Sequence, residues 1–253
     1  MAGLRVNKGN NNNKKKKKKK HGDESITTIK SLPNELLVEI LAKVASRSIF
    51  DLCKVKLCCK DFLYAAEDDY VYHHASMEKF ALVPLPWFTG QGEFSFLKRC
   101  RESGNSKISY REGMVQYFRS SSLISGFENL KKAAMEGHND AKYVYCMLLM
   151  CCEDEQERKR GFDLFCSLKA STCVARCRKR VRCYIRKMWL SNNPVVRNHN
   201  LSFCTTCQSG RMKKISTGWI GDGDGDDDAN IGISCEYCRV DYELVLFCNM
   251  FQV

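Results

Sequence analysis

The sequence contains no apolar run of the length that a membrane-spanning helix needs, about 20 residues, and its longest candidate runs only from Tyr143 to Cys152. The N-terminus lacks the apolar core of a secretory signal peptide. No paired nucleophile and base, phosphate-binding glycine loop or open metal site stands out either. We therefore expect an intracellular protein, in the nucleus, the cytoplasm or both, with no membrane partner and no catalytic activity of its own.

The first 30 residues combine an Asn run with seven consecutive lysines, Lys14 to Lys20. These lysines contribute more than half of the net charge of +12, so the rest of the chain is only weakly basic. A block of like charges cannot pack, and we expect residues 1–30 to form a disordered tail. This tail has two possible roles: it binds a partner, as a nuclear import signal or a polyanion-binding segment, or it is a solvated tail without a dedicated partner.

The chain holds 16 cysteines. Thiols in a reducing compartment are free, buried or bound to metal rather than paired in disulfides. Most of these cysteines lie within apolar helical patterns, where cysteine behaves as a small hydrophobe. We expect Cys146, Cys151, Cys152 and Cys166 to be core residues of this kind.

Two amphipathic helices are expected in residues 31–76. After Pro33, a residue favoured at the start of a helix, apolar residues recur at helical spacing from Leu36 to Val44. Ser48 and Asp51 have the spacing of a capping box that opens a second helix, whose apolar face continues to Leu63. A segment of this length cannot bury the apolar faces of both helices by itself. Part of this apolar surface must therefore contact another part of the chain or another protein.

The motifs LP-x-E-L, I-L, D-L and C-K-x-F follow one another in this segment, and their order and spacing resemble an F-box. The resemblance implies docking onto the Skp adaptor, and through it a cullin, in an SCF-type ubiquitin ligase. Cys58 departs from the pattern, because many F-boxes carry valine there. The alternative is an ordinary helix pair of another α domain. The residues that the resemblance assigns to adaptor binding are Leu32, Pro33, Leu36, Ile40, Leu41, Val44, Leu52, Val55, Cys59 and Phe62.

Residues 77–109 read as a linker followed by a short helix, Phe94 to Arg101. The linker contains PLPWF, whose prolines favour an extended or turn conformation, and Trp87 and Phe88 are expected to plug a domain junction. Residues 110–190 place small residues such as Gly113, Gly137 and Gly161 among aromatic ones at the spacing of helical hairpins.

The element A-A-x-x-G-H-x-x-A in this region resembles Sel-like and tetratricopeptide-like repeats, which stack helix pairs and present a protein-binding face. We recognise fewer units than a free-standing solenoid needs. Together with the F-box, the PLPWF linker and YREGM, this hairpin resembles a group of plant F-box proteins. The resemblance covers residues 31 to 190 and names no substrate.

A basic stretch from Arg176 to Lys187 follows the hairpin. If it is helical, Val181, Tyr184, Ile185 and Met188 form an apolar stripe on it. Such a helix either binds nucleic acid or an acidic partner, or packs by its stripe onto the preceding hairpin and leaves its charges solvated. We favour the packed helix, because no nucleic-acid-binding module accompanies it.

Two C-x-x-C pairs lie in residues 200–250 and are separated by 27 residues. Paired thiolates of this kind suit tetrahedral zinc, so we predict a structural zinc ion bound by Cys204, Cys207, Cys235 and Cys238. The surrounding residues look strand-like and predict a small zinc-ribbon-like β segment. The aspartates between the pairs do not form an EF-hand, because Asp227 replaces the turn glycine and Ile233 the final glutamate. The alternative is four ordinary thiols.

The sequence thus predicts a mainly α protein with an F-box, a helical-hairpin region and a small cysteine-rich C-terminal segment. We expect a non-catalytic substrate receptor of an SCF-type ubiquitin ligase that holds an unknown protein target. A nuclear, nucleic-acid-associated zinc-knuckle protein is the alternative, although we do not expect nucleic acid to be a partner. A C-x-x-C redox enzyme is weaker, since no thioredoxin-like βαβ pattern surrounds the pairs.

Overall fold

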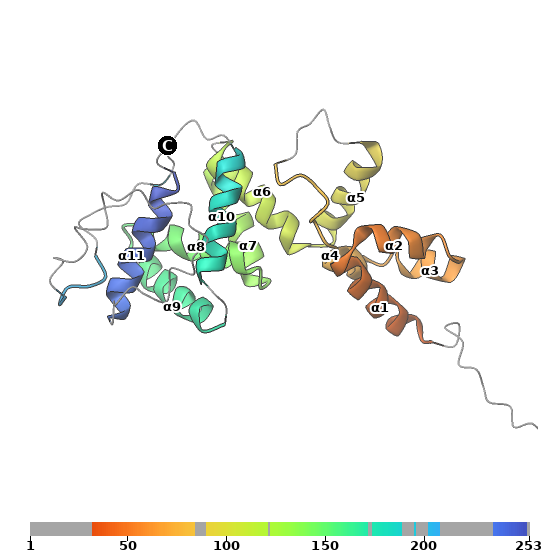
Figure 1. Cartoon of the computed structure of the whole chain (residues 1–253), viewed down its shortest axis with the longest axis horizontal. Coiled ribbons are helices and arrows are strands. Elements are labelled where there is room, and N and C mark those ends of the chain that lie inside the picture. The colour runs from red at the N-terminus through yellow and green to blue at the C-terminus, as the bar shows by residue number, and fades with distance from the viewer. Residues whose placement is uncertain are drawn as a thin grey trace, which may run out of the picture. The chain divides into compact units, whose positions relative to one another are not determined.

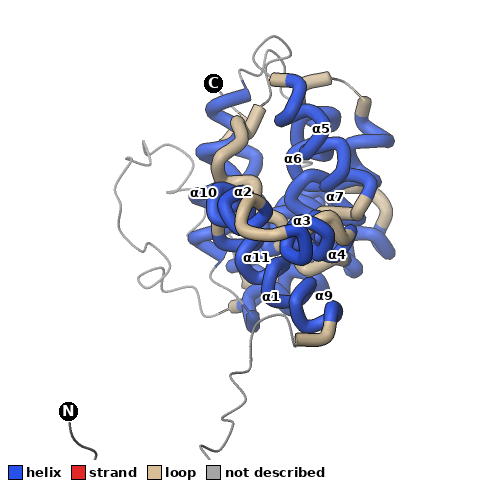
Figure 2. Tube along the Cα trace, turned by 90° about the vertical axis from the view of Figure 1, so that its right-hand side faces the viewer, coloured by secondary structure: helices blue, strands red, loops and turns tan. Residues whose placement is uncertain are grey.

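The computed structural model describes residues 32–83, 90–120, 122–171, 174–188, 195, 202–207 and 235–251. Within these ranges the chain forms helices joined by turns and loops, with no strand (Figures 1 and 2). The helices are α1 (Asn34–Arg47), α2 (Ile49–Lys56), α3 (Lys60–Ala65), α4 (Asp69–His74), α5 (Gln91–Glu102), α6 (Ser106–Phe118), α7 (Leu123–Met135), α8 (Asn139–Cys151), α9 (Glu155–Ser171), α10 (Val174–Met188) and α11 (Glu236–Asn249).

The mainly α class is therefore confirmed. None of the helices in the described ranges is long and apolar enough to cross a membrane. The tail of residues 1–30, the residues Trp87 and Phe88, and the Asp-rich loop between the cysteine pairs lie outside the described residues.

Helices α1 to α4 share one hydrophobic core, which includes Leu37, Leu41, Leu52, Val71 and Met77. As the sequence predicts, the Ser48 side chain accepts a hydrogen bond from the backbone N–H of Asp51 and caps α2. The single second helix that we expected is wrong, because Leu57 to Cys59 form a turn that divides it into α2 and α3. The N–H of Leu57 closes α2 by donating to carbonyls in its last turn.

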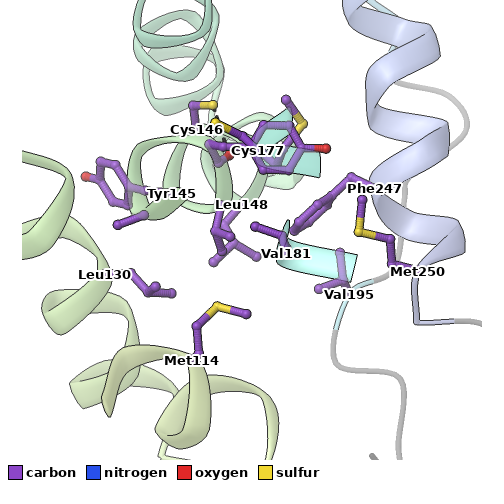
Figure 3. Packing of buried hydrophobic residues seen from close by; sticks show 14 of the residues in the cluster. Met114, Leu130, Tyr145, Cys146, Leu148, Cys177, Val181, Val195, Phe247 and Met250 are labelled. Atoms are coloured by element: carbon purple, nitrogen blue, oxygen red, sulfur yellow. Dashed lines mark hydrogen bonds between the residues drawn. The ribbon is translucent and has the colours of Figure 1, made fainter. Parts of the chain in front are cut away.

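The second core lies among α6, α7, α8, α9, α10 and α11. Figure 3 shows Met114, Leu130, Leu148, Val181 and Phe247, from five of these helices, pointing into it. The predicted apolar stripe of the basic stretch is confirmed, since its members on α10 are buried. Cys146 is fully buried as predicted, whereas Cys151, Cys152 and Cys166 are half-buried.

Glycines allow the hairpin helices to approach one another closely. A Cβ atom added at Gly113 would lie 2.9 Å from Leu130, and one at Gly161 would lie 2.8 Å from Met150, as their predicted packing role requires. Gly126, which the sequence analysis did not single out, is tighter still. Gly137 has a different role from the one expected, because it adopts a left-handed φ of 85° in the turn between α7 and α8.

The predicted strand-like texture after Cys235 is wrong, because Glu236–Asn249 is helix α11. Aromatic and β-branched residues suggested a strand. However, Val240, Leu244 and Phe247 recur with a helical period and are buried on one face. The C-terminal segment therefore belongs to the helical core in this range and is not a separate β knuckle.

Polar contacts join α4 and the loop after it to α6. Asn105, which is 1% exposed, caps α6 through its side-chain oxygen and donates to the carbonyls of Tyr72 and Ala75. Further along α6, the Arg111 guanidinium donates to the carbonyls of Met77, Phe80 and Ala81. Side-chain donors on α6 and at its N-cap thus bind backbone carbonyls at the end of α4 and in the loop that follows it.

Candidate functional site

Large apolar side chains are exposed on helices α1 to α3. On α1, Leu36 is 47% exposed and Ile40 is 46% exposed. The other side of α1 faces the core, with Leu37 and Leu41 buried there. Single exposed apolar residues are common on protein surfaces, but several on helices this short indicate a binding surface.

The residues predicted for adaptor binding fall into three groups by exposure. Leu32, Pro33, Leu36, Ile40 and Cys59 are exposed, and Val44, Val55 and Phe62 are half-buried. Leu41 and Leu52 are buried in the core of α1 to α4, so they support this surface from beneath. Exposed apolar residues that the sequence analysis did not assign to the surface are Phe50, Leu57, Leu63 and Tyr64. Phe50 and Leu57 are apolar but lie off the stripe that faces the core, and this pattern could have identified them as surface residues.

The four paired cysteines come together. Their sulfur atoms all lie within 4.8 Å of one another, and the Sγ atoms of Cys204 and Cys235 are 3.8 Å apart. Four thiolates bound to one zinc ion at about 2.3 Å are separated by about 3.8 Å along the edges of the tetrahedron. The donor set and its dimensions therefore fit a tetrahedral metal ion.

Two different elements supply the pairs. Cys204 and Cys207 lie in the loop of residues 202–207, while Cys235 is the N-cap of α11 and Cys238 lies in its first turn. The backbone N–H of Cys207 donates to the Cys204 sulfur at 3.3 Å, which closes the first pair into a tight turn. This bond, followed by hydrogen bonds from Cys238 and from the backbone of Thr206, lowers the pKa of the Cys204 thiol to about 6.

The pKa values of Cys207 and Cys238 shift in the opposite direction. Hydrogen bonding to Cys204 and then to Cys235 raises the pKa of Cys207, and burial with the neighbouring thiols raises that of Cys238. Cys204 is thus the thiol that loses its proton most readily, while Cys207 and Cys238 resist ionisation, as crowded thiols do. A divalent cation would remove this conflict, because thiols that bind a metal lose their protons.

Aromatic rings fix both pairs to α9. Phe162 stacks on Phe203, the residue before Cys204, with ring centroids 5.7 Å apart. It also stacks on Tyr237, which lies between Cys235 and Cys238, at 5.2 Å. Arg158 covers the Phe203 ring, its guanidinium carbon 4.7 Å from the centroid. One helix therefore holds residues adjacent to both cysteine pairs.

Buried charge fixes α11 further along its length. The Glu243 carboxylate accepts a hydrogen bond from Arg178 of α10 at 2.5 Å and one from the Tyr143 hydroxyl of α8 at 2.7 Å. All three side chains are buried. Burial also raises the pKa of Tyr143 well above its usual value, so the hydroxyl remains a donor. The basic helix thus uses one of its arginines inside the core, which the sequence analysis did not predict.

Comparison with known proteins matches two families along the chain. A family model described as F-box-like matches residues 29–78. A model of plant tetratricopeptide repeats matches residues 80–186. The chain is thus similar to an F-box followed by a plant-type helical repeat region, which confirms the resemblance predicted from the sequence.

Proteins named as F-box proteins from Arabidopsis thaliana share sequence with this chain. That at locus At1g67623, named as a putative F-box protein, is 28% identical over 82% of this chain and 72% of its own length. F-box protein At2g35280 is 28% identical over 53% of this chain and 80% of its own length. No solved structure matches the chain significantly.

Proposed function

We propose that this protein is the substrate-recognition subunit of an SCF-type ubiquitin ligase, in which it performs no catalysis itself. Its F-box would dock the Skp-type adaptor, and through it a cullin, while residues 110–190 and the C-terminal segment hold a protein target. Proximity of target and ubiquitin-charged partner would supply the rate enhancement. The observation that carries this proposal is the exposed apolar set on α1 to α3, within the segment that matches the F-box-like family.

Adaptor binding is tested with Leu36→Asp and Ile40→Asp, single substitutions of residues that are about half exposed. Each puts a charge on surface that must lose water at the contact, so we expect adaptor recovery in a pulldown to fall at least tenfold. Both variants should fold, because neither side chain belongs to the core. Leu41→Asp is unsuitable, since a buried charge there would unfold the segment.

The matched control is Ile124→Asp. Ile124 is 84% exposed on α7, outside the F-box-like match, so its replacement should leave adaptor recovery unchanged. Recovery of the adaptor at wild-type levels by folded Leu36→Asp and Ile40→Asp would contradict the proposal. Salt-sensitive retention of the wild type on DNA or RNA, without adaptor, would favour the nucleic-acid alternative instead.

We further propose that Cys204, Cys207, Cys235 and Cys238 hold one structural zinc ion. The sulfur separations support this proposal. Four thiolates leave no open coordination position, so the metal would cross-link the loop of residues 202–207 to α11. Elemental mass spectrometry on protein purified reduced and without chelator should find one zinc per chain, and none in Cys204→Ser with Cys235→Ser. Wild-type protein without stoichiometric metal would exclude the site.

A further inference from the structure

Helix α11 carries two buried carboxylates with different partners. Glu243 is occupied by Arg178 and Tyr143, as described above. Asp241 is 1% exposed and faces the loop that contains the first cysteine pair. A buried carboxylate is costly to desolvate unless several donors satisfy it, so the partners of Asp241 indicate what it holds in place.

Among the described residues, Asp241 binds three consecutive ones that end at a cysteine of the cluster. One oxygen of Asp241 accepts from the backbone N–H of Phe203 at 3.0 Å. The other accepts from the Ser202 hydroxyl at 2.6 Å and from the Cys204 backbone N–H at 3.0 Å. Two backbone donors from adjacent residues fix the peptide planes on either side of Phe203, and thereby the direction in which the Cys204 side chain leaves the backbone.

The spacing along α11 gives this arrangement its rigidity. Cys235, Cys238 and Asp241 follow at intervals of three residues at the start of one helix, so they share a face. The helix thus carries two of the four thiols together with the carboxylate that orients a third. These bonds therefore tie the backbone of the loop directly to α11.

We propose that Asp241 is the positioning residue of the cysteine site, which sets the first pair at the distance from the second that one metal ion requires. This inference depends on the zinc site proposed above. Partners of this kind, outside the ligands themselves, typically contribute 10- to 100-fold to metal affinity.

Asp241→Asn separates orientation from packing, because it keeps the size of the side chain. Whichever way the amide turns, its NH2 group faces a backbone N–H, that of Phe203 or that of Cys204. One hydrogen bond becomes a contact between two donors, so the loop must shift. The expected result is a metal affinity at least tenfold lower than that of the wild type, measured by competition with a coloured zinc chelator on the full chain.

The charge control is Glu236→Gln, on the same helix beside Cys235. Glu236 is exposed and pairs with Lys169 rather than with the loop, so its replacement removes an equal charge but no positioning bond. Its affinity should stay within about twofold of the wild type, since exposed charges are screened. An equal loss in Glu236→Gln and Asp241→Asn would show a charge effect and overturn the positioning role.

Cobalt(II) supplies a readout that a general loss of stability would not produce. In the wild type, the absorption of bound cobalt should report four thiolates in a tetrahedron, and in Asp241→Asn its intensity should fall as Cys204 leaves the metal. Ser202→Ala removes only the hydrogen bond from the Ser202 hydroxyl and should lower the metal affinity about fivefold. It replaces Asp241→Asn as the test variant if Asp241→Asn does not fold. Wild-type affinity and spectrum in folded Asp241→Asn, or in Ser202→Ala if that variant must serve, would overturn this inference. Wild-type protein that binds neither metal would overturn the zinc site itself.

Discussion

Replacing Gly126 by alanine should destabilise the repeat region, although alanine is the better helix former. A Cβ atom at this position would lie 2.4 Å from the backbone nitrogen of Tyr117 and 2.7 Å from its Cα. A flexible side chain could move away, but the backbone of α6 cannot, so α6 and α7 must separate. Overpacking of this kind costs about 3 kcal/mol at the upper end of its usual range, and the gain in helix propensity returns about 1 kcal/mol.

The expected net loss is therefore about 2 kcal/mol in the free energy of unfolding. In a folded unit of roughly 150 to 250 residues this corresponds to a Tm that is lower by roughly 4 to 8 °C. Urea titration followed by circular dichroism measures the loss, and a thermal scan measures the shift. Gly92→Ala is the matched control, because Gly92 lies in α5 and an added Cβ atom there would meet nothing within 4 Å. It should be neutral or stabilising by up to about 1 kcal/mol. A Gly126→Ala variant as stable as the wild type would refute the close approach of α6 and α7.

Three further predictions concern other parts of the chain. Glu243→Gln neutralises the carboxylate that pairs with the buried Arg178 and should lower the free energy of unfolding by about 3 kcal/mol in chemical denaturation; an unchanged midpoint would contradict the buried ion pair. Burial lowers the pKa of His138 from 6.5 to about 4, so the unfolded chain takes up a proton that the folded chain refuses. The free energy of unfolding should therefore decrease by up to about 3 kcal/mol as the pH is lowered from 6.5 to 4. His138→Asn should weaken this pH dependence of stability. Deletion of residues 1–30 should leave adaptor recovery unchanged and lower nuclear accumulation of a tagged protein; an unaltered distribution would reduce the lysine run to a passive tail.

Local signals in the sequence predicted much of the helical structure, because they act within a few residues. The Ser48 cap and the stripe on α10 are of this kind. The expectation of a strand after Cys235 was wrong because it rested on residue types that favour strands. The spacing of the apolar residues Val240, Leu244 and Phe247 is helical. The division between α2 and α3 was missed because Leu57 is apolar and gives no breaker signal, although it is 87% exposed.

The candidate sites were predictable only in part. The C-x-x-C spacing named the four cysteines without knowing how far apart they would lie. Asp241 was out of reach, because its role depends on which face of α11 meets residues 202–204, a contact between segments 37 to 39 residues apart. Gly126 likewise acts through a neighbouring helix, whose register no local pattern specifies.

The separation of the two hydrophobic cores has a consequence for how a protein with the proposed function would diversify. The core of α1 to α4, to which α5 and α6 add Cys100 and Ile108, shares no buried residue with the core of α6 to α11 in the described parts of the chain. Polar bonds from Asn105 and Arg111 also join these elements. A substitution that reshapes α7 to α11 therefore need not alter the packing beneath the F-box surface. Under the proposed function, new targets would be acquired by mutation of one module while the other continues to bind the adaptor, so selection on recognition and selection on assembly would act on different residues.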